Sequence, residues 1–224
     1  MRGLYAILDT EALASREMPP LAFAEAVLAA RPAALQLRAK NASARDVLAL
    51  LGQLAPLCKQ AGVPLVCNDR PDLAVLAGAD LVHLGQDDAP IDLVRGLFPT
   101  LRIGLSTHTR AQLEQALAAK PAYVAYGPVF ATTSKKDHAA VVGLEGLRVA
   151  AGLARRAGVP LVAIGGITQA RAHEVALHAD AVAVIGALVE GDVREVRSRA
   201  SQLQTVFSGG HVSEPATNER VATS

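Results

Sequence analysis

Basic side chains alternate with apolar ones in one short segment, where they could bind an anion. The segment reads Leu35-Gln36-Leu37-Arg38-Ala39-Lys40. Side chains alternate between the two faces of a strand, so Gln36, Arg38 and Lys40 share one face and the apolar residues share the other. Two cations directed inward are costly unless an anion meets them, and a planar guanidinium suits phosphate oxygens. We therefore expect Arg38 to bind an anionic ligand, whereas Lys40 also fits a solvated rim.

Acidic side chains follow two further apolar runs. Asn68 and Asp69 come after one run, and Asp87 and Asp88 come after the next. Carboxylates that lie close together repel unless a cation joins them, and oxygen ligands favour magnesium. With the cations of the first segment nearby, this combination suits a diphosphate held by Mg²⁺. The spacing alone does not separate Asp87 from Asp88.

Some polar residues have a structural explanation as helix caps. We expect Ser43 to cap the helix that ends before Gly62. We also expect Asp72 and Asp92 to cap the helices in which they stand.

Ser106 allows two interpretations. It could contact a ligand, or it could begin the cap of the following helix, for which Thr107 and Thr109 compete. His108, in the same segment, could act as an acid or base, but a lone histidine in a loop is more often structural or solvated. We therefore give His108 no role.

Glycines and hydroxyls indicate a second anion site. Gly165 and Gly166 follow one apolar run and Gly186 follows another, and glycines there let backbone N–H groups approach a phosphate. The polar segment 127–137 carries hydroxyls beside Lys135, which suit phosphate contacts. The residues thus indicate one metal-assisted and one metal-free anion site. They would serve two phosphorylated substrates, or one substrate with phosphate at both ends.

The elements that must position these residues alternate between strands and helices. We predict strands over 4–8, 33–38, 65–67, 81–83, 102–105, 123–126, 161–164 and 181–185. We predict helices over 21–30, 43–61, 71–77, 90–97, 109–119, 144–157, 168–177 and 192–206. Eight such βα units in just over 200 residues match an α/β fold, a single (β/α)8 TIM barrel.

A doubly wound open sheet is the alternative fold. It would more often show fewer strands and a glycine-rich first turn, whereas the first turn here reads Asp9-Thr10-Glu11.

We expect the catalytic barrel to occupy residues 1–207 and a disordered, functionally silent tail to occupy residues 208–224.

The composition agrees with an enclosed barrel and excludes several function classes. Of the 224 residues 51% are hydrophobic but only 3% aromatic, which suits strands covered closely by helices. The 22 Lys and Arg residues balance the 21 Asp and Glu residues, against a nucleic-acid surface built on bulk charge. Cys58 and Cys67 make neither a disulfide framework nor a zinc site. No apolar stretch is long enough to span a bilayer, and we see no signal peptide, so we expect a cytoplasmic protein.

In their order and spacing, these motifs resemble those of the thiamine-phosphate synthase family over about residues 4–206. The matching segments are Gln36-Leu37-Arg38-Ala39-Lys40, Asn68-Asp69, His83-Leu84-Gly85-Gln86-Asp87-Asp88, Gly104-Leu105-Ser106-Thr107-His108, Tyr126-Gly127-Pro128-Val129-Phe130, Thr132-Thr133-Ser134-Lys135 and Ala163-Ile164-Gly165-Gly166-Ile167. The resemblance implies a transferase of thiamine biosynthesis that condenses 4-amino-2-methyl-5-hydroxymethylpyrimidine diphosphate with 4-methyl-5-(2-phosphoethyl)thiazole, or its carboxylated form. The products are thiamine phosphate and pyrophosphate. The implied mechanism is a dissociative, Mg²⁺-assisted substitution, in which pyrophosphate leaves before the thiazole nitrogen attacks.

The resemblance also implies roles for individual residues. The pyrimidine diphosphate would be held by Gln36, Leu37, Arg38, Ala39, Lys40, Asn68, Ser106 and Lys135. The thiazole side would meet Thr132, Thr133 and Ser134, and the thiazole phosphate would meet Gly166, Ile185 and Gly186. The residues expected to act in catalysis are Arg38, Lys40, Ser106 and Lys135. Mg²⁺ would be bound by Asp69 and Asp88, a choice over Asp87 that only the resemblance makes.

This chain departs from the family pattern at a few positions. Ala39 stands where the family often has Glu, Ala131 where Pro is common, and Ser134 where Thr is common. Gly186 stands where the family often has Ser, which would remove one hydroxyl from the phosphate site but leave the backbone donors.

Other interpretations remain open. A thiazole tautomerase-like relative would share the fold and the thiazole-phosphate site, but such relatives typically have His where this chain has Pro128. A non-catalytic regulatory relative would bind thiazole phosphate without turnover. An unrelated barrel enzyme acting on a sugar phosphate would leave Arg38, Asp69 and Asp88 without a role. The sequence thus favours the synthase, with small-molecule substrates, no nucleic acid or membrane partner, and a homo-oligomer allowed.

Overall fold

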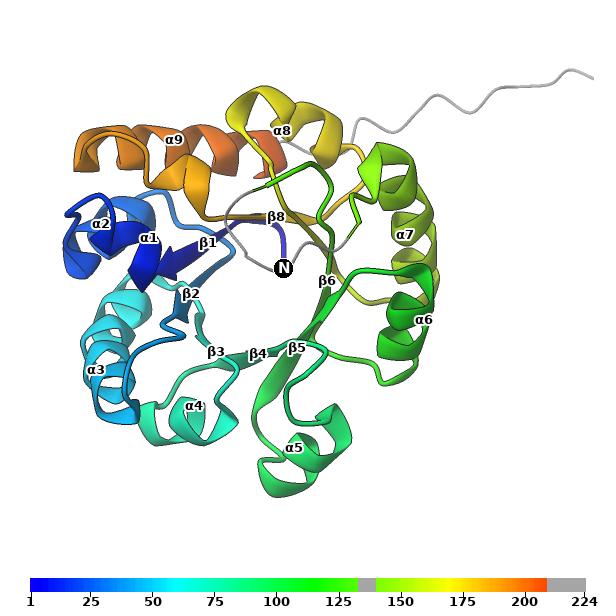
Figure 1. Ribbon diagram of the computed structural model, residues 1–224, viewed down its shortest axis with the longest axis horizontal. Coiled ribbons are helices and arrows are strands. Elements are labelled where there is room, and N and C mark those ends of the chain that lie inside the picture. Colours follow the sequence, from blue (N-terminus) through cyan, green and yellow to red (C-terminus); the bar gives the residue numbers. More distant parts are fainter. Residues whose placement is uncertain (133–139, 209–224) are drawn as a thin grey trace, which may run out of the picture.

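Eight parallel strands close into a barrel around which the helices form an outer ring (Figure 1). The computed structural model describes residues 1–132 and 140–208. The strands are β1 (Gly3–Asp9), β2 (Ala34–Arg38), β3 (Leu65–Asn68), β4 (Leu81–Leu84), β5 (Arg102–Thr107), β6 (Tyr123–Tyr126), β7 (Leu161–Ile164) and β8 (Ala181–Val184). Each strand pairs in parallel with the next, and β8 pairs with β1, so the predicted barrel is confirmed.

The helices cover the outside of the barrel. They are α1 (Thr10–Ala14), α2 (Pro20–Leu28), α3 (Ala44–Ala61), α4 (Pro71–Ala77), α5 (Ile91–Leu97), α6 (Arg110–Ala118), α7 (Gly143–Ala157), α8 (Gln169–Ala176), the 3₁₀ helix η1 (Gly186–Leu188) and α9 (Val193–Ser208). Among the described residues, no helix is both long and apolar enough to cross a membrane.

Two short helices were not predicted, and the last helix extends beyond its predicted end. Where we expected only a turn after the first strand, Asp9 caps the short helix α1. Where we expected only a loop after β8, the chain forms the 3₁₀ helix η1. The last helix reaches Ser208, which sequence reasoning placed in the tail. The rest of the predicted tail, 209–224, lies outside the described residues.

The predicted caps are partly right. Ser43 caps α3 through a hydrogen bond that its Oγ accepts from the N–H of Asp46 at 3.2 Å. The prediction that Asp72 and Asp92 are caps is wrong, because both lie inside the first turn of their helices. Pro71 occupies the first position of α4, where a missing N–H needs no capping partner.

The strands divide the apolar residues into two clusters. Side chains on their outer faces, such as Leu35 and Leu37, pack against the helices. Those on their inner faces fill the barrel: Tyr5, Ile7, Ala34, Val66, Leu81, Tyr123, Ala125, Val162, Ala181, Ala183 and Ile185. Toward the carboxyl ends of β2 to β5 the same inner rows become polar, with Gln36, Asn68, His83 and Ser106. The fold therefore gathers its inward polar side chains at the end of the barrel where enzymes of this architecture act.

Candidate active site

Two amide side chains line the inside of the barrel at β2 and β3. Gln36 is only 2% exposed, and its Nε2 donates a hydrogen bond to Asn68 Oδ1 at 2.6 Å. Each amide has further donors or acceptors that this bond does not use. The pair can therefore also bind a heterocycle that carries both hydrogen-bond donors and acceptors. Gln36 and Asn68, predicted on separate strands, are in direct contact.

Arg38 lies beside these amides and forms an ion pair with Asp9, its register partner at the end of β1. Asp9 is 4% exposed and also caps α1, since its Oδ1 accepts a hydrogen bond from the N–H of Ala12 at 2.9 Å. Sequence reasoning missed Asp9. The available signal was its position at the carboxyl end of the first strand. Because Asp9 fixes one edge of the guanidinium, Arg38 can present its other N–H groups toward the site.

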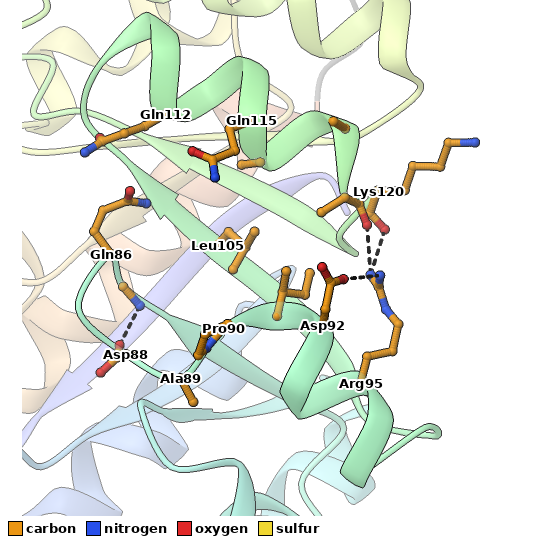
Figure 2. Close-up of a pocket in the computed structure, with 15 residues that line it drawn as sticks. Gln86, Asp88, Ala89, Pro90, Asp92, Arg95, Leu105, Gln112, Gln115 and Lys120 are labelled. Carbon is orange, nitrogen blue, oxygen red and sulfur yellow. Dashed lines mark hydrogen bonds and ion pairs between the residues drawn. The ribbon is translucent and has the colours of Figure 1, made fainter.

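A carboxylate pair lies at the ends of β3 and β4, next to a lysine. Lys40 Nζ is 3.3 Å from Asp69 Oδ2. Asp88 Oδ2 accepts a hydrogen bond from the N–H of Gly85 at 2.5 Å (Figure 2). Partial burial raises the pKa of Asp88 above its usual value, and the neighbouring Asp69 carboxyl raises it further. The structure thus brings Asp69, Asp88 and Lys40 together, whereas Asp87 is exposed.

The carboxylate pair can hold only part of a metal's coordination sphere. Among the described residues, no three His, Cys, Asp or Glu side chains gather in a way that could hold a metal ion. Mg²⁺ commonly binds proteins through one or two carboxylates and completes its shell with water and substrate phosphates. Two carboxylates and an open side are therefore a donor set that fits Mg²⁺.

A chain of buried hydrogen bonds runs up the barrel to Ser106. The hydroxyls of Tyr5 and Tyr123 are 2.7 Å apart, and the Tyr123 hydroxyl is 2.8 Å from His83 Nδ1. On the other side of the ring, His83 Nε2 is 2.8 Å from Ser106 Oγ. Ser106 is 5% exposed and lies within β5, and Thr109 is the residue that caps α6, in a full capping box. Of the two interpretations left open for Ser106, the structure excludes the cap.

A second cavity, of about 450 Å³, lies at the carboxyl ends of β6 to β8. Four of the residues expected on the thiazole side line it: Thr132, Gly166, Ile185 and Gly186. Gly166 has φ +62°, and a Cβ there would lie 2.8 Å from the Phe130 Cβ, so the chain needs glycine at this point. His108 also lines the cavity, and its Nδ1 is 2.7 Å from the Gly127 carbonyl oxygen.

Not every predicted residue reaches these two places. The Leu37 side chain is 1% exposed and packs with the outer cluster, against which Ala39 also packs. Only their backbone atoms can therefore contribute to binding. The expected residues Thr133, Ser134 and Lys135 lie outside the described residues.

A larger groove lies elsewhere, on the outer side of the barrel between α5 and α6 (Figure 2). Its volume is about 980 Å³, and Asp88 lies at its edge. Arg95 in this groove is already occupied, since its Nη2 donates to the Ala119 carbonyl oxygen at 2.9 Å. The groove lacks Arg38, Lys40 and the inward amides, and we do not assign the chemistry to it.

Comparisons with known proteins agree with one another. A family model described as thiamine monophosphate synthase matches residues 4–188. The chain is 40% identical over 200 residues to thiamine-phosphate synthase of Chloroflexus aurantiacus, covering 89% of this chain and 90% of the relative. It is 44% identical over 187 residues to the enzyme of that name from Herpetosiphon aurantiacus, covering 83% and 88%.

Solved structures give the same result. The thiamine phosphate pyrophosphorylase from Pyrococcus furiosus matches with a TM-score of 0.78 and 32% identity, over 91% of this chain and 94% of that one. A 3-hexulose-6-phosphate synthase matches with a TM-score of 0.62 at 17% identity, which shows the shared barrel alone.

Proposed function

Because the chain belongs to the thiamine monophosphate synthase family and is thus a transferase of thiamine biosynthesis, we propose that its site condenses the pyrimidine diphosphate with the thiazole phosphate to give thiamine phosphate and pyrophosphate. One observation carries this proposal. The barrel end holds a cluster of cations and carboxylates at β1 to β4 and, across the mouth, a glycine-lined cavity at β6 to β8. Each place suits one of the two anionic substrates.

We assign the diphosphate to the first place. Arg38 and Lys40 supply positive charge for its oxygens, and Asp69 and Asp88 would hold Mg²⁺. When bound, the ion would neutralise charge on the leaving diphosphate. Lys40 Nζ lies 3.3 Å from Asp69 Oδ2, which supports a role in which this lysine contacts the diphosphate beside the expected metal ligands.

The pyrimidine ring belongs between the diphosphate and the buried network. The Gln36–Asn68 pair and Ser106 offer hydrogen bonds to its ring nitrogens and amino group. The C–O bond to pyrophosphate breaks first and the electron pair leaves with the pyrophosphate, so negative charge develops beside Arg38 and Lys40. This step needs stabilisation of the leaving group and no protein nucleophile. Lys135, outside the described residues, is expected to join these cations.

The thiazole phosphate belongs in the second cavity. The backbone N–H groups near Gly166, Ile185 and Gly186 can approach a phosphate closely, and hydroxyls from Thr132, Thr133 and Ser134 would contact the thiazole side. Fixing the phosphate there would direct the thiazole nitrogen toward the carbon that has lost pyrophosphate. The new C–N bond uses the nitrogen lone pair, so holding two reactants in line is the main demand on the protein.

We also infer that the reaction takes place in the cytoplasm. Cys58 and Cys67 are buried with free thiols, which is typical of a reducing compartment.

The test is formation of thiamine phosphate from the two purified substrates with Mg²⁺, read by fluorescence after oxidation. We expect product with Mg²⁺ and none with EDTA. Asp88→Ala should sharply reduce turnover, whereas Asp87→Ala, the same change at an adjacent exposed residue, should not. No product from folded wild-type protein would refute the proposal. Equal activity in the two variants would remove Asp88 from the metal site.

A further inference from the structure

One arginine lines the second cavity. Arg171 stands in the first turn of α8, the helix that follows the Gly165-Gly166 turn (Figure 1). Its Nη1 donates a hydrogen bond to the Gly166 carbonyl oxygen at 2.8 Å. Its guanidinium carbon lies 4.5 Å from the centre of the Phe130 ring, which holds one face of the group. Although the residue is exposed, its charged end is thus fixed at the rim of the glycine turn.

The guanidinium of Arg171 is only partly used by these contacts. A guanidinium has five N–H donors, and a single one is engaged with Gly166. Within residues 1–132 and 140–208, Arg171 has no carboxylate partner, unlike Arg38, Arg70, Arg110 and Arg148. A cation with free donors and one orienting contact is prepared to bind an anion that enters the cavity.

The backbone alone leaves a phosphate in this cavity poorly neutralised. The N-terminus of α8 supplies a partial positive charge of roughly half a unit, against nearly two negative charges on a phosphate monoester. Thr168 at the start of α8 makes no side-chain capping bond, so it does not compete with a ligand there. Gly186 offers no hydroxyl. Arg171 is the only Lys or Arg among the described residues that line the cavity.

We propose that Arg171 binds the phosphate of the thiazole substrate and makes the enzyme select the phosphorylated thiazole over the free alcohol. This inference rests on the proposed function. The planar fork would grip two phosphate oxygens while the glycine turn supplies backbone donors from the other side. Glu190 also lines the cavity and is exposed, so its opposing charge is screened by solvent.

The proposal is tested by steady-state kinetics with each substrate varied in turn. Arg171→Met should raise KM for thiazole phosphate by at least about tenfold, which equals about 1.4 kcal/mol of binding. KM for the pyrimidine diphosphate should stay within about twofold, because that substrate binds across the barrel mouth. Arg171→Lys keeps the charge but loses the planar fork, so its KM for thiazole phosphate should lie between those of the wild type and Arg171→Met. Glu190→Gln, a control that removes the opposite charge from the same cavity, should not raise KM.

A merely structural role for Arg171 predicts a different result. If the residue only held the Gly166 turn in place, Arg171→Met would reduce kcat/KM equally for thiazole phosphate and for the free thiazole alcohol. If Arg171 binds the phosphate, Arg171→Met lowers kcat/KM for thiazole phosphate alone. The ratio of kcat/KM for thiazole phosphate to that for the alcohol then falls about tenfold. An equal loss for both, or no loss, would overturn the proposal.

Binding of inorganic phosphate separates this inference from the proposed function. Wild-type protein should bind phosphate, measured by calorimetry, at least about tenfold more tightly than Arg171→Met. A wild-type protein that shows this difference but forms no thiamine phosphate would refute the synthase assignment and keep the anion site. Product formation by the wild type together with equal phosphate binding in both proteins would support the synthase assignment and refute the role of Arg171.

Discussion

A single methyl group at Gly104 should disrupt the centre of the barrel. Gly104 lies in β5, one inward position below Ser106, and the Tyr123 ring occupies the space where its side chain would be. A Cβ at Gly104 would lie 2.5 Å from the Tyr123 hydroxyl oxygen and closer still to ring carbons Cζ and Cε1. Ordinary van der Waals contact begins at 3.4 Å. In Gly104→Ala, therefore, the tyrosine ring must move.

The cost of that movement follows from what surrounds the ring. Tyr123 is 0% exposed, so its ring is enclosed within the core. Inserting a methyl group into such a core costs about 1–3 kcal/mol, and each of the two hydrogen bonds from Tyr123 contributes about 0.5–1.5 kcal/mol more if it breaks. The free energy of unfolding should fall by about 2–6 kcal/mol, a large part of the roughly 5–15 kcal/mol that stabilises a typical domain. For a chain of this size the Tm should drop by at least about 4 °C.

The same substitution elsewhere in the chain should have the opposite effect. Gly52 lies inside α3, and a Cβ there would meet nothing within 4 Å. Gly52→Ala should therefore raise the free energy of unfolding by about 0.5–1 kcal/mol, because alanine favours the helix and restricts the unfolded chain. Thermal unfolding followed by circular dichroism measures both variants. A Tm for Gly104→Ala that matches or exceeds the wild-type value would refute the packing argument.

Three further predictions concern the buried network, the metal site and the thiols. Tyr123→Phe removes two buried hydrogen bonds and should lower kcat/KM about tenfold, because Ser106 is then held less firmly. The control is Tyr126→Phe, which should leave kcat/KM unchanged because the Tyr126 hydroxyl makes no hydrogen bond with another described residue. The raised pKa of Asp88 means that its ionised form destabilises the folded protein, an effect that appears as the pH rises through that pKa. Asp88→Asn should therefore raise the Tm in EDTA at neutral pH while lowering Mg²⁺-dependent turnover about a hundredfold; a lower Tm would contradict the sign. Burial raises the pKa of Cys58 and of Cys67 to about 12, so at about pH 8 roughly one thiol in 10⁴ is ionised. A disulfide reagent should therefore label the two cysteines only after the protein unfolds.

Much of the fold could be predicted because the sequence states it locally. Each strand is a short apolar run, and each strand is followed by a helical pattern whose ends carry recognisable signals such as Ser43 and Gly62. The rule that chemistry collects at the carboxyl ends of barrel strands then places Gln36, Asn68 and Asp88 at one end. The alternation along β2 also predicts that Leu37 faces the helices, as the structure shows.

The contacts that sequence reasoning missed join residues far apart in the chain. Asp9 faces Arg38 only because β1 and β2 pair in one particular register, and nothing in either segment specifies that partner. The helix α1 escaped prediction because its five residues are too few to show a period. Arg171 follows the Gly165-Gly166 turn closely in sequence, but its value as a ligand depends on Phe130, on another loop.

The two tyrosines inside the barrel show how its packing and its site depend on each other. Several inner-face residues of the barrel are small, such as Ala125 and Ala183, and the two large rings of Tyr5 and Tyr123 pack among them. A buried hydroxyl needs a hydrogen-bond partner, so the rings must meet each other and a third polar group, His83. The imidazole then contacts Ser106 with its second nitrogen. The position of the Ser106 hydroxyl is thus set from the barrel's interior, so residues deep in the barrel constrain the site that we propose at its mouth.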